Sequence, residues 1–402
     1  MRAVRLVGMA ALCAVIAGCA SKAPEELAKA PPPPPPVVAP PSPTMTAAYA
    51  PQELVTVTGS RVRGDAVAAE RSYFVPPVIV ATDPGREQYD GKEVSPVKLT
   101  VVEPVSTFSV DVDTGAYANA RRFLTQGMMP PKDAVRTEEM INYFRYDYAK
   151  PKDRSQPFTV TTDVAKSPWN AGSYLMRIGL RGYDIDSEER PPANLVFLMD
   201  VSGSMNSPDK LPLVKTALAG LAGELSPQDR VSIVVYAGAA GLVLEPTNDT
   251  AKIRRALESL EAGGSTAGGA GIELAYRVAE DNFIKGGVNR VILATDGDFN
   301  VGVSSTKALI ELIETKRDSG ITLTTLGFGQ GNYNEAMMEQ VANKGNGNYA
   351  YIDSALEAKK VLGEEMSSTL FTIAKDVKIQ VEFNPAVIAQ YRLVGYENRA
   401  LR

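Results

Sequence analysis

The chain has 402 residues, of which 44% are apolar and 22% are charged, and its formal net charge is −5. This length is too great for one small core, so we expect two or three domains of ordinary globular composition. The negative charge, without a basic stripe, argues against a nucleic-acid-binding surface. The sequence contains no histidine and only two cysteines, Cys13 and Cys19. Histidine-dependent catalysis and histidine zinc sites are therefore excluded, and a metal bound by the rest of the chain must be bound by oxygen.

Residues 1–18 are predicted to be a signal peptide, because two arginines precede an apolar stretch that is too short to span a bilayer. Ile16-Ala-Gly-Cys19 resembles a bacterial lipobox, in which the signal is cut before the cysteine and lipid is attached to it. This resemblance implies that acyl chains such as palmitate on Cys19 hold the protein in a membrane of the cell envelope. Alanine and serine follow the cysteine in place of an aspartate, which implies the outer membrane, facing the periplasm. An ordinary signal peptide cut elsewhere is the alternative.

The remaining chain divides by composition. Residues 19–73 are predicted to be a disordered, Pro-rich linker; six consecutive prolines at 31–36 form a stiff spacer that rises ~3 Å per residue. We expect this spacer to hold the folded part away from the lipid surface. Residues 74–190 are predicted to form a small α+β region, and residues 191–370 the main α/β domain. Residues 371–402 are interpreted as the start of a β-rich C-terminal region that is truncated.

In the α+β region, order is expected to begin near residues 74–81. A strand within 108–115 is followed by a helix at 117–124, and a second helix has Thr137 as N-cap with two glutamates in its first turn. The first helix is expected to share one apolar face among Tyr117, Ala120 and Leu124, and the second to use Met140, Ile141, Tyr143 and Phe144. Two alternating strands are predicted at 158–164 and 174–180.

In the main domain, apolar runs alternate with amphipathic helices, which predicts a doubly wound, mostly parallel sheet. Strands are expected at 195–200, 231–236, 290–295 and 321–327, with short edge strands at 242–244 and near 348–352. Helices are expected at 213–221, at 272–283, from about 305 to 317, and after Ser354, which opens a capping box with Glu357. Beyond them, strands are predicted from Val377 and from Tyr391. Either these two add to the strands at 158–180 or the chain is cut short.

Polar oxygens follow the first buried strand of this domain. Its apolar run ends at Asp200, and Ser202 and Ser204 follow at alternate positions. A carboxylate and two hydroxyls are hard donors of the kind that hold magnesium or manganese.

Two other segments complete this pattern. The strand at 290–295 also ends in an aspartate, Asp296, and a glycine-rich loop containing Thr266 precedes the helix at 272. Because ligands in open α/β sheets lie beyond the carboxyl ends of the strands, we expect these groups to meet. The pattern resembles the von Willebrand factor A (vWA) domain and its metal-ion-dependent adhesion site, whose signature is Asp-x-Ser-x-Ser, a distant threonine and a distant aspartate. Asp200, Ser202, Ser204, Thr266 and Asp296 match its five positions in order.

The resemblance extends over about residues 100–402. Residues 108–148 and the segment around Gly395-Tyr-Glu-Asn-Arg399 are similar to the YfbK type of bacterial vWA lipoproteins. That family implies a vWA, Rossmann-like fold and a further β-rich C-terminal region.

The resemblance also implies how the ion is held. Ser202, Ser204 and Thr266 would supply hydroxyls, while Asp200 and Asp296 would act directly or through water. The expected cation is Mg²⁺, with Mn²⁺ or Ca²⁺ as alternatives. An open coordination position would accept an acidic side chain of a protein partner. Since hydrolysis would also need a base or nucleophile beside the ion, we expect an adhesion or scaffold module and not an enzyme.

Two enzyme interpretations compete. Asp113-Thr-Gly115 matches the triplet of aspartic proteases, but it occurs once and its flanking helices do not suit that fold. Asp111 resembles the nucleophile of haloacid-dehalogenase-type phosphatases, which makes a metal-dependent phosphatase-like hydrolase the alternative function. A structural role for Asp111 and Asp113, accepting hydrogen bonds from backbone donors, is favoured over both. Ser207-Pro-Asp-Lys210 matches Ser-x-x-Lys, a motif too short to weigh.

Overall fold

The computed structural model describes residues 87–153, 155–184, 190–264, 268–297, 306–365, 373–374 and 377–401. The predicted signal peptide, the Pro-rich linker and the expected start of order at 74–81 lie outside these ranges. Among the helices in the described ranges, none has the length and apolar character needed to cross a membrane.

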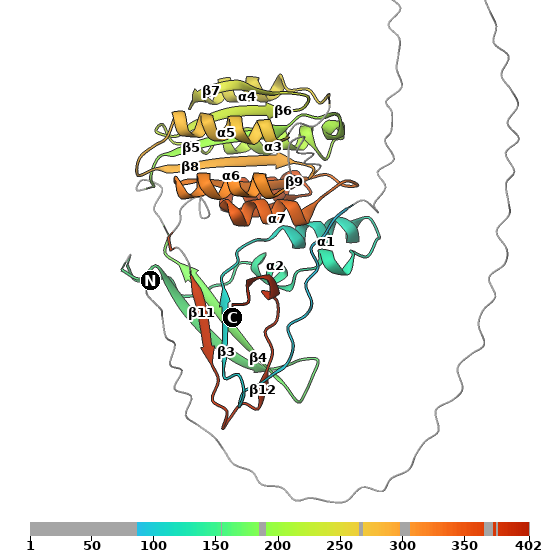
Figure 1. Ribbon diagram of the computed structural model, residues 1–402, viewed down its shortest axis with the longest axis vertical. Helices are drawn as coiled ribbons and strands as arrows, with labels where there is room; N and C mark the ends of the chain where they lie inside the picture. The colour runs from blue at the N-terminus through green and yellow to red at the C-terminus, as the bar shows by residue number, and fades with distance from the viewer. Residues whose placement is uncertain are drawn as a thin grey trace, which may run out of the picture. The chain divides into compact units, whose positions relative to one another are not determined.

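A six-stranded sheet in the order β10-β9-β8-β5-β6-β7 forms the centre of the main domain (Figure 1). Its strands are β5 (Ala193–Asp200), β6 (Arg230–Tyr236), β7 (Ala240–Thr247), β8 (Val288–Thr295), β9 (Ile321–Phe328) and β10 (Asn346–Ile352). All neighbours are parallel except β6 and β7, which are antiparallel. The predicted doubly wound, mostly parallel sheet is therefore confirmed, and β7 is longer than the predicted strand at 242–244.

Strand β5 is buried along its whole length because helices cover both faces of the sheet. Successive side chains of a strand point to opposite faces, so β5 contributes to two cores. Leu195, Phe197 and Met199 pack into one, and Val196 and Leu198 into the other. The apolar run in the sequence is unbroken because both faces of β5 are buried.

Helices α3 (Leu211–Leu221), α4 (Thr250–Glu258) and α8 (Ala355–Lys359) pack into the core on one face, where α8 continues as a π-helix, Lys360–Glu365. Helices α5 (Gly268–Asp281) and α6 (Thr306–Asp318) pack on the other face, and α7 (Glu335–Lys344) packs beside β9 and β10 (Figure 1). Neither α4 nor α7 is among the predicted helices. Phe283, predicted on the apolar face of a helix, lies beyond the end of α5 and is 44% exposed.

The region before the main domain contains β1 (Lys98–Leu99), β2 (Val105–Ser109), α1 (Gly115–Thr125), a 3₁₀ turn (Lys132–Ala134), α2 (Thr137–Asn142), β3 (Phe158–Lys166) and β4 (Tyr174–Gly182). Strands β3 and β4 are the two strands predicted at 158–164 and 174–180, and they pair in antiparallel orientation. The last two strands are β11 (Lys378–Glu382) and β12 (Gln390–Tyr391). They pair with β2 and β1 respectively, so the alternative in which they add to the strands at 158–180 is wrong.

The predicted apolar faces of α1 and α2 are wrong in part. Leu124 is 57% exposed, whereas Asn119 and Phe123 of α1 are buried. Helix α2 begins at Thr137 itself, and Arg136 holds the N-cap position without a side-chain cap. Its buried residues are the two glutamates of the first turn, because Glu139 accepts a hydrogen bond from the backbone N–H of Ala116 at 2.7 Å. Tertiary contacts therefore override helical periodicity here.

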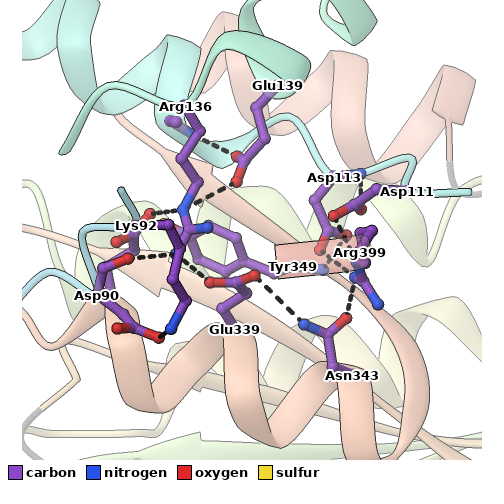
Figure 2. Close-up of polar contacts among 12 residues, drawn as sticks. Asp90, Lys92, Asp111, Asp113, Arg136, Glu139, Glu339, Asn343, Tyr349 and Arg399 are labelled. Carbon is purple, nitrogen blue, oxygen red and sulfur yellow. Dashed lines mark hydrogen bonds and ion pairs between the residues drawn. The ribbon is translucent and has the colours of Figure 1, made fainter. Parts of the chain in front are cut away.

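Buried charged groups join this region to α7 (Figure 2). The Arg136 guanidinium donates to Glu335 at 3.1 Å and also pairs with Glu339. Glu139 lies 3.5 Å from the same guanidinium. One arginine therefore faces three carboxylates that are almost inaccessible to water.

Candidate metal centre

Asp200 and Asp296 lie at the same edge of the sheet. Strands β5 and β8 are parallel neighbours in which Met199 lies opposite Ala294. Asp200 is the last residue of β5, and Asp296 follows the last residue of β8. Both carboxylates are fully buried. The sequence-based expectation that these two strand ends meet is thereby confirmed.

The Asp200 carboxylate is held by three donors. Its Oδ1 accepts from the backbone N–H of Ser202 at 2.8 Å, and its Oδ2 accepts from the Thr295 hydroxyl at 2.9 Å and the Tyr236 hydroxyl at 3.3 Å. Burial raises the pKa of Asp200 to about 6, and the negative charge of Asp296 adds to this rise. Bound positive charge nearby would favour the ionised form of Asp200.

The two serines bring a second pair of oxygens to this edge. The hydroxyls of Ser202 and Ser204 lie 3.1 Å apart, Ser202 buried and Ser204 exposed. A 3₁₀ turn, Gly203–Asn206, follows β5 and carries Ser204 toward solvent. The Asp-x-Ser-x-Ser segment thus runs from a buried carboxylate to an exposed hydroxyl.

Thr266 lies outside the described residues, but the chain just before it is held against this segment. The backbone N–H of Gly263 donates to the carbonyl of Val201 at 2.8 Å, and the N–H of Gly203 donates to the carbonyl of Gly264 at 3.1 Å. Gly264 has φ +83°, a conformation that favours glycine.

Lys210 is also part of this centre, although its sequence motif was too short to weigh. Its ammonium donates to Asp296 Oδ2 at 2.9 Å and to Asn332 Oδ1 at 3.1 Å. The Asn332 amide donates to the same Asp296 oxygen at 3.2 Å. Among the described residues, the sequence did not predict a place in this centre for Tyr236, Thr295, Lys210 or Asn332. Tyr236 and Thr295 could have been found, since both end strands next to Asp200.

The donor set suits a hard divalent cation. Two carboxylates and two hydroxyls meet where burial penalises uncompensated negative charge. In the part of the chain that the structure describes, no three His, Cys, Asp or Glu side chains gather as a metal-binding group. A cation at this centre would therefore depend on the serine hydroxyls as well as on Asp200 and Asp296.

Asp111 and Asp113 lie elsewhere, in the packing between the N-terminal region and β10. Asp111 accepts from the backbone N–H of Asp113 at 3.1 Å and from the Arg399 guanidinium at 2.9 Å. Asp113 accepts from the backbone N–H of Tyr349 at 2.9 Å. The predicted role of these carboxylates as acceptors for backbone donors is confirmed.

Comparisons with known families match three segments of the chain. The models described as von Willebrand factor, as von Willebrand factor type A domain, and as the C-terminal region of the uncharacterized protein YfbK match residues 83–177, 194–364 and 368–402 respectively. The central sheet, except Ala193 at the start of β5, and the ligand candidates Asp200, Ser202, Ser204 and Asp296 lie within the second segment.

Among related proteins, YfbK of Escherichia coli is 50% identical over 328 residues, which are 80% of this chain and 57% of that protein. The protein sll0103 of Synechocystis is 32% identical over 189 residues, 46% of this chain and 43% of that protein. The chain thus spans about half the length of these relatives. Human inter-alpha-trypsin inhibitor heavy chain H3 is 28% identical over 232 residues, 54% of this chain and 25% of that protein.

Solved structures with a similar fold include BatB of Bacteroides thetaiotaomicron, with 24% identity and a TM-score of 0.38 over 44% of this chain and 98% of that one. A von Willebrand factor type A protein of Catenulispora acidiphila has 20% identity and a TM-score of 0.40 over 48% of this chain and 45% of that one. The family models thus identify a von Willebrand factor type A domain in residues 194–364 and a C-terminal region of the YfbK type in residues 368–402, in line with the 50% identity to YfbK of Escherichia coli.

Proposed function

We propose that this chain is an envelope-anchored, divalent-cation-dependent protein-binding module of the adhesion or scaffold kind. Its cation would be held by Asp200, Ser202, Ser204, Thr266 and Asp296. The observation that carries this proposal is the meeting of Asp200 and Asp296 at one sheet edge, beside two serine hydroxyls 3.1 Å apart.

The proposed cation is Mg²⁺, which prefers oxygen ligands and retains water where protein ligands are few. An acidic side chain of a protein partner could then coordinate the bound ion. Ser204 and Gly203 are exposed at this edge, so the partner would approach from their side. Asp200 and Asp296 are buried and would bind the ion on the side that faces the protein interior.

The envelope location rests on the lipobox-like segment ending at Cys19. An acylated Cys19 followed by the Pro-rich linker would present the domain to the periplasm from the outer membrane. Radiolabelled palmitate incorporated by the wild-type chain and not by Cys19→Ala would support this anchor, and equal labelling of the two would contradict it.

A binding role is preferred to catalysis on chemical grounds. The sequence has no histidine to act as a base beside the ion. Asp111, the nucleophile of the alternative phosphatase-like hydrolase, is buried and paired with Arg399. A carboxylate in that position has neither access to a phosphate ester nor a free oxygen facing solvent.

The decisive experiment is a pull-down from envelope extract with the full chain as bait, in Mg²⁺ and again with chelator. We expect a specific partner to be retained in Mg²⁺ only and to be lost with Asp200→Ala. Asp281→Ala, at an exposed carboxylate at the end of α5, is the control and should retain the partner. A partner that is retained equally with chelator and with Asp200→Ala would contradict the proposal.

A further inference from the structure

The buried lysine beside Asp296 is the feature that the adhesion-site pattern leaves unexplained. We propose that Lys210 is an internal cation that competes with the metal ion for Asp296 and keeps the loaded centre positively charged. This inference rests on the proposed metal site. It identifies a residue that sets cation affinity and favours an acidic ligand.

The first support is the geometry of a closed polar triangle. Lys210 Nζ, Asn332 and Asp296 Oδ2 each contact the other two, at 2.9, 3.1 and 3.2 Å. The Lys210 side chain is only 4% exposed. An ammonium group has donors and no acceptor, so Lys210 cannot coordinate a metal and can only oppose it.

The second support is that the lysine stem is held in place. A Cβ atom on Gly329, which has φ +72°, would lie 2.3 Å from Lys210 Cε. Only glycine leaves room there for the stem. The Lys210 backbone is anchored as well, because its N–H donates to the carbonyl of Ser207 at 3.0 Å and its carbonyl accepts from Val214 at 2.9 Å. The ammonium is therefore directed at Asp296 by both backbone and packing.

The third support is the charge of the centre. Among the described residues of the centre, Asp200 and Asp296 contribute two negative charges and Lys210 contributes one positive charge. Without the lysine, a divalent ion would leave the centre neutral, whereas with it the loaded centre carries one net positive charge. In a buried site such a charge acts strongly on its neighbours. Lys210 should therefore weaken cation binding and strengthen the attraction for an acidic partner group.

The test is Mn²⁺ binding to the full chain, measured from the electron paramagnetic resonance signal of free Mn²⁺. We expect Lys210→Met to raise Mn²⁺ affinity by roughly tenfold or more, because a +1 charge is removed a few ångströms from the ion. Lys210→Arg, which keeps the charge, should remain within about threefold of wild type. Lys215→Met, in helix α3, which begins directly after Lys210, is the matched control and should leave the affinity unchanged, because the Lys215 ammonium donates to the carbonyl of Glu258 and not to Asp296.

Asn332→Ala provides a second variant if Lys210→Met fails to fold. It removes the acceptor that holds the ammonium and a donor on Asp296, so affinity should rise a few-fold. A Mn²⁺ affinity that is unchanged or lower in folded Lys210→Met, or in Asn332→Ala if Lys210→Met does not fold, would overturn the role of Lys210. Mn²⁺ uptake by wild type and Lys210→Met with equal affinity would refute this inference alone. Uptake by neither would refute the metal site as well.

Discussion

At the scale of single residues, the position of Asp200 depends on neighbours outside the ligand pattern. The Thr295 hydroxyl donates to Asp200 at 2.9 Å and accepts from the N–H of Gly297 at 3.2 Å. Tyr236 reaches the same carboxylate from the adjoining strand, where it lies opposite Asp200. These contacts orient a carboxylate that water does not reach.

Thr295→Val keeps the shape of the side chain and removes its hydroxyl. We expect it to lower the free energy of unfolding by about 1–3 kcal/mol, since a buried carboxylate loses a donor and the N–H of Gly297 an acceptor. Urea denaturation measures this change. Thr216→Val, on the exposed surface of α3, is the control and should shift stability by less than about 0.5 kcal/mol. Equal effects of the two substitutions would contradict the role of Thr295.

At the scale of elements, the loop between β9 and α7 connects the N-terminal region with the candidate metal centre. Glu87 accepts from the N–H of Gly331 in this loop at 2.8 Å and pairs with Arg122 of α1 at 2.9 Å. Gln88 donates to the carbonyl of Tyr333 at 2.9 Å. Asn332 lies between Gly331 and Tyr333, and its amide donates to Asp296. Contacts with the N-terminal region thus hold the loop that carries Asn332.

Arg122→Met should destabilise the fold by about 3–5 kcal/mol, because it leaves the Glu87 carboxylate buried without its arginine. Backbone amides of the β9–α7 loop should also exchange faster in hydrogen exchange, since Glu87 holds this loop. Arg177→Met breaks an exposed pair with Asp163 and serves as the control, with an expected cost far below that of Arg122→Met. Unchanged exchange in residues 329–334 would show that the loop is held by other contacts.

At the scale of the whole molecule, the N-terminal region and the main domain share an excess of buried carboxylates (Figure 2). Burial raises the pKa of Glu139 and of Asp113 well above the usual range, and neighbouring carboxylates add to both shifts. Burial likewise raises the pKa of Glu335 from 4.5 to about 7, against the opposing charge of Arg136. The folded chain therefore holds protons that the unfolded chain releases.

Because buried carboxylates hold protons in the folded state, we expect the free energy of unfolding to fall as pH rises from about 4.5 to about 7. Below that window Glu335 is protonated in both states, and within it only the folded state keeps the proton, so rising pH favours unfolding. Glu335→Gln should reduce the loss by roughly 1–3 kcal/mol in urea titrations across this range. Glu245→Gln, at an exposed site, should follow the wild-type curve. A wild-type stability that rises over the window would contradict the assignment.

Much of the centre could be predicted because its information is local. The apolar runs that end at Asp200 and Asp296 indicate buried strands, and parallel strands bring their carboxyl ends to one edge. The adhesion-site pattern added the two serines, which lie beside Asp200, and Thr266, which lies outside the described residues. Helix α7 was missed because its buried face includes Glu335 and Glu339. Glutamates are expected to be exposed, so they conceal the apolar periodicity that predicts a helix.

The sequence by itself determined the central sheet and the two strand ends that carry the aspartates, because hydrophobic periodicity and strand direction are properties of short segments. Only the tertiary structure decided that β11 and β12 pair with β2 and β1, since those partners lie near opposite ends of the described chain. The tertiary structure likewise decided that Lys210 lies beside Asp296. A lysine in a polar loop is expected to be exposed, and only packing against Gly329 and pairing with Asp296 bury its charge in the centre.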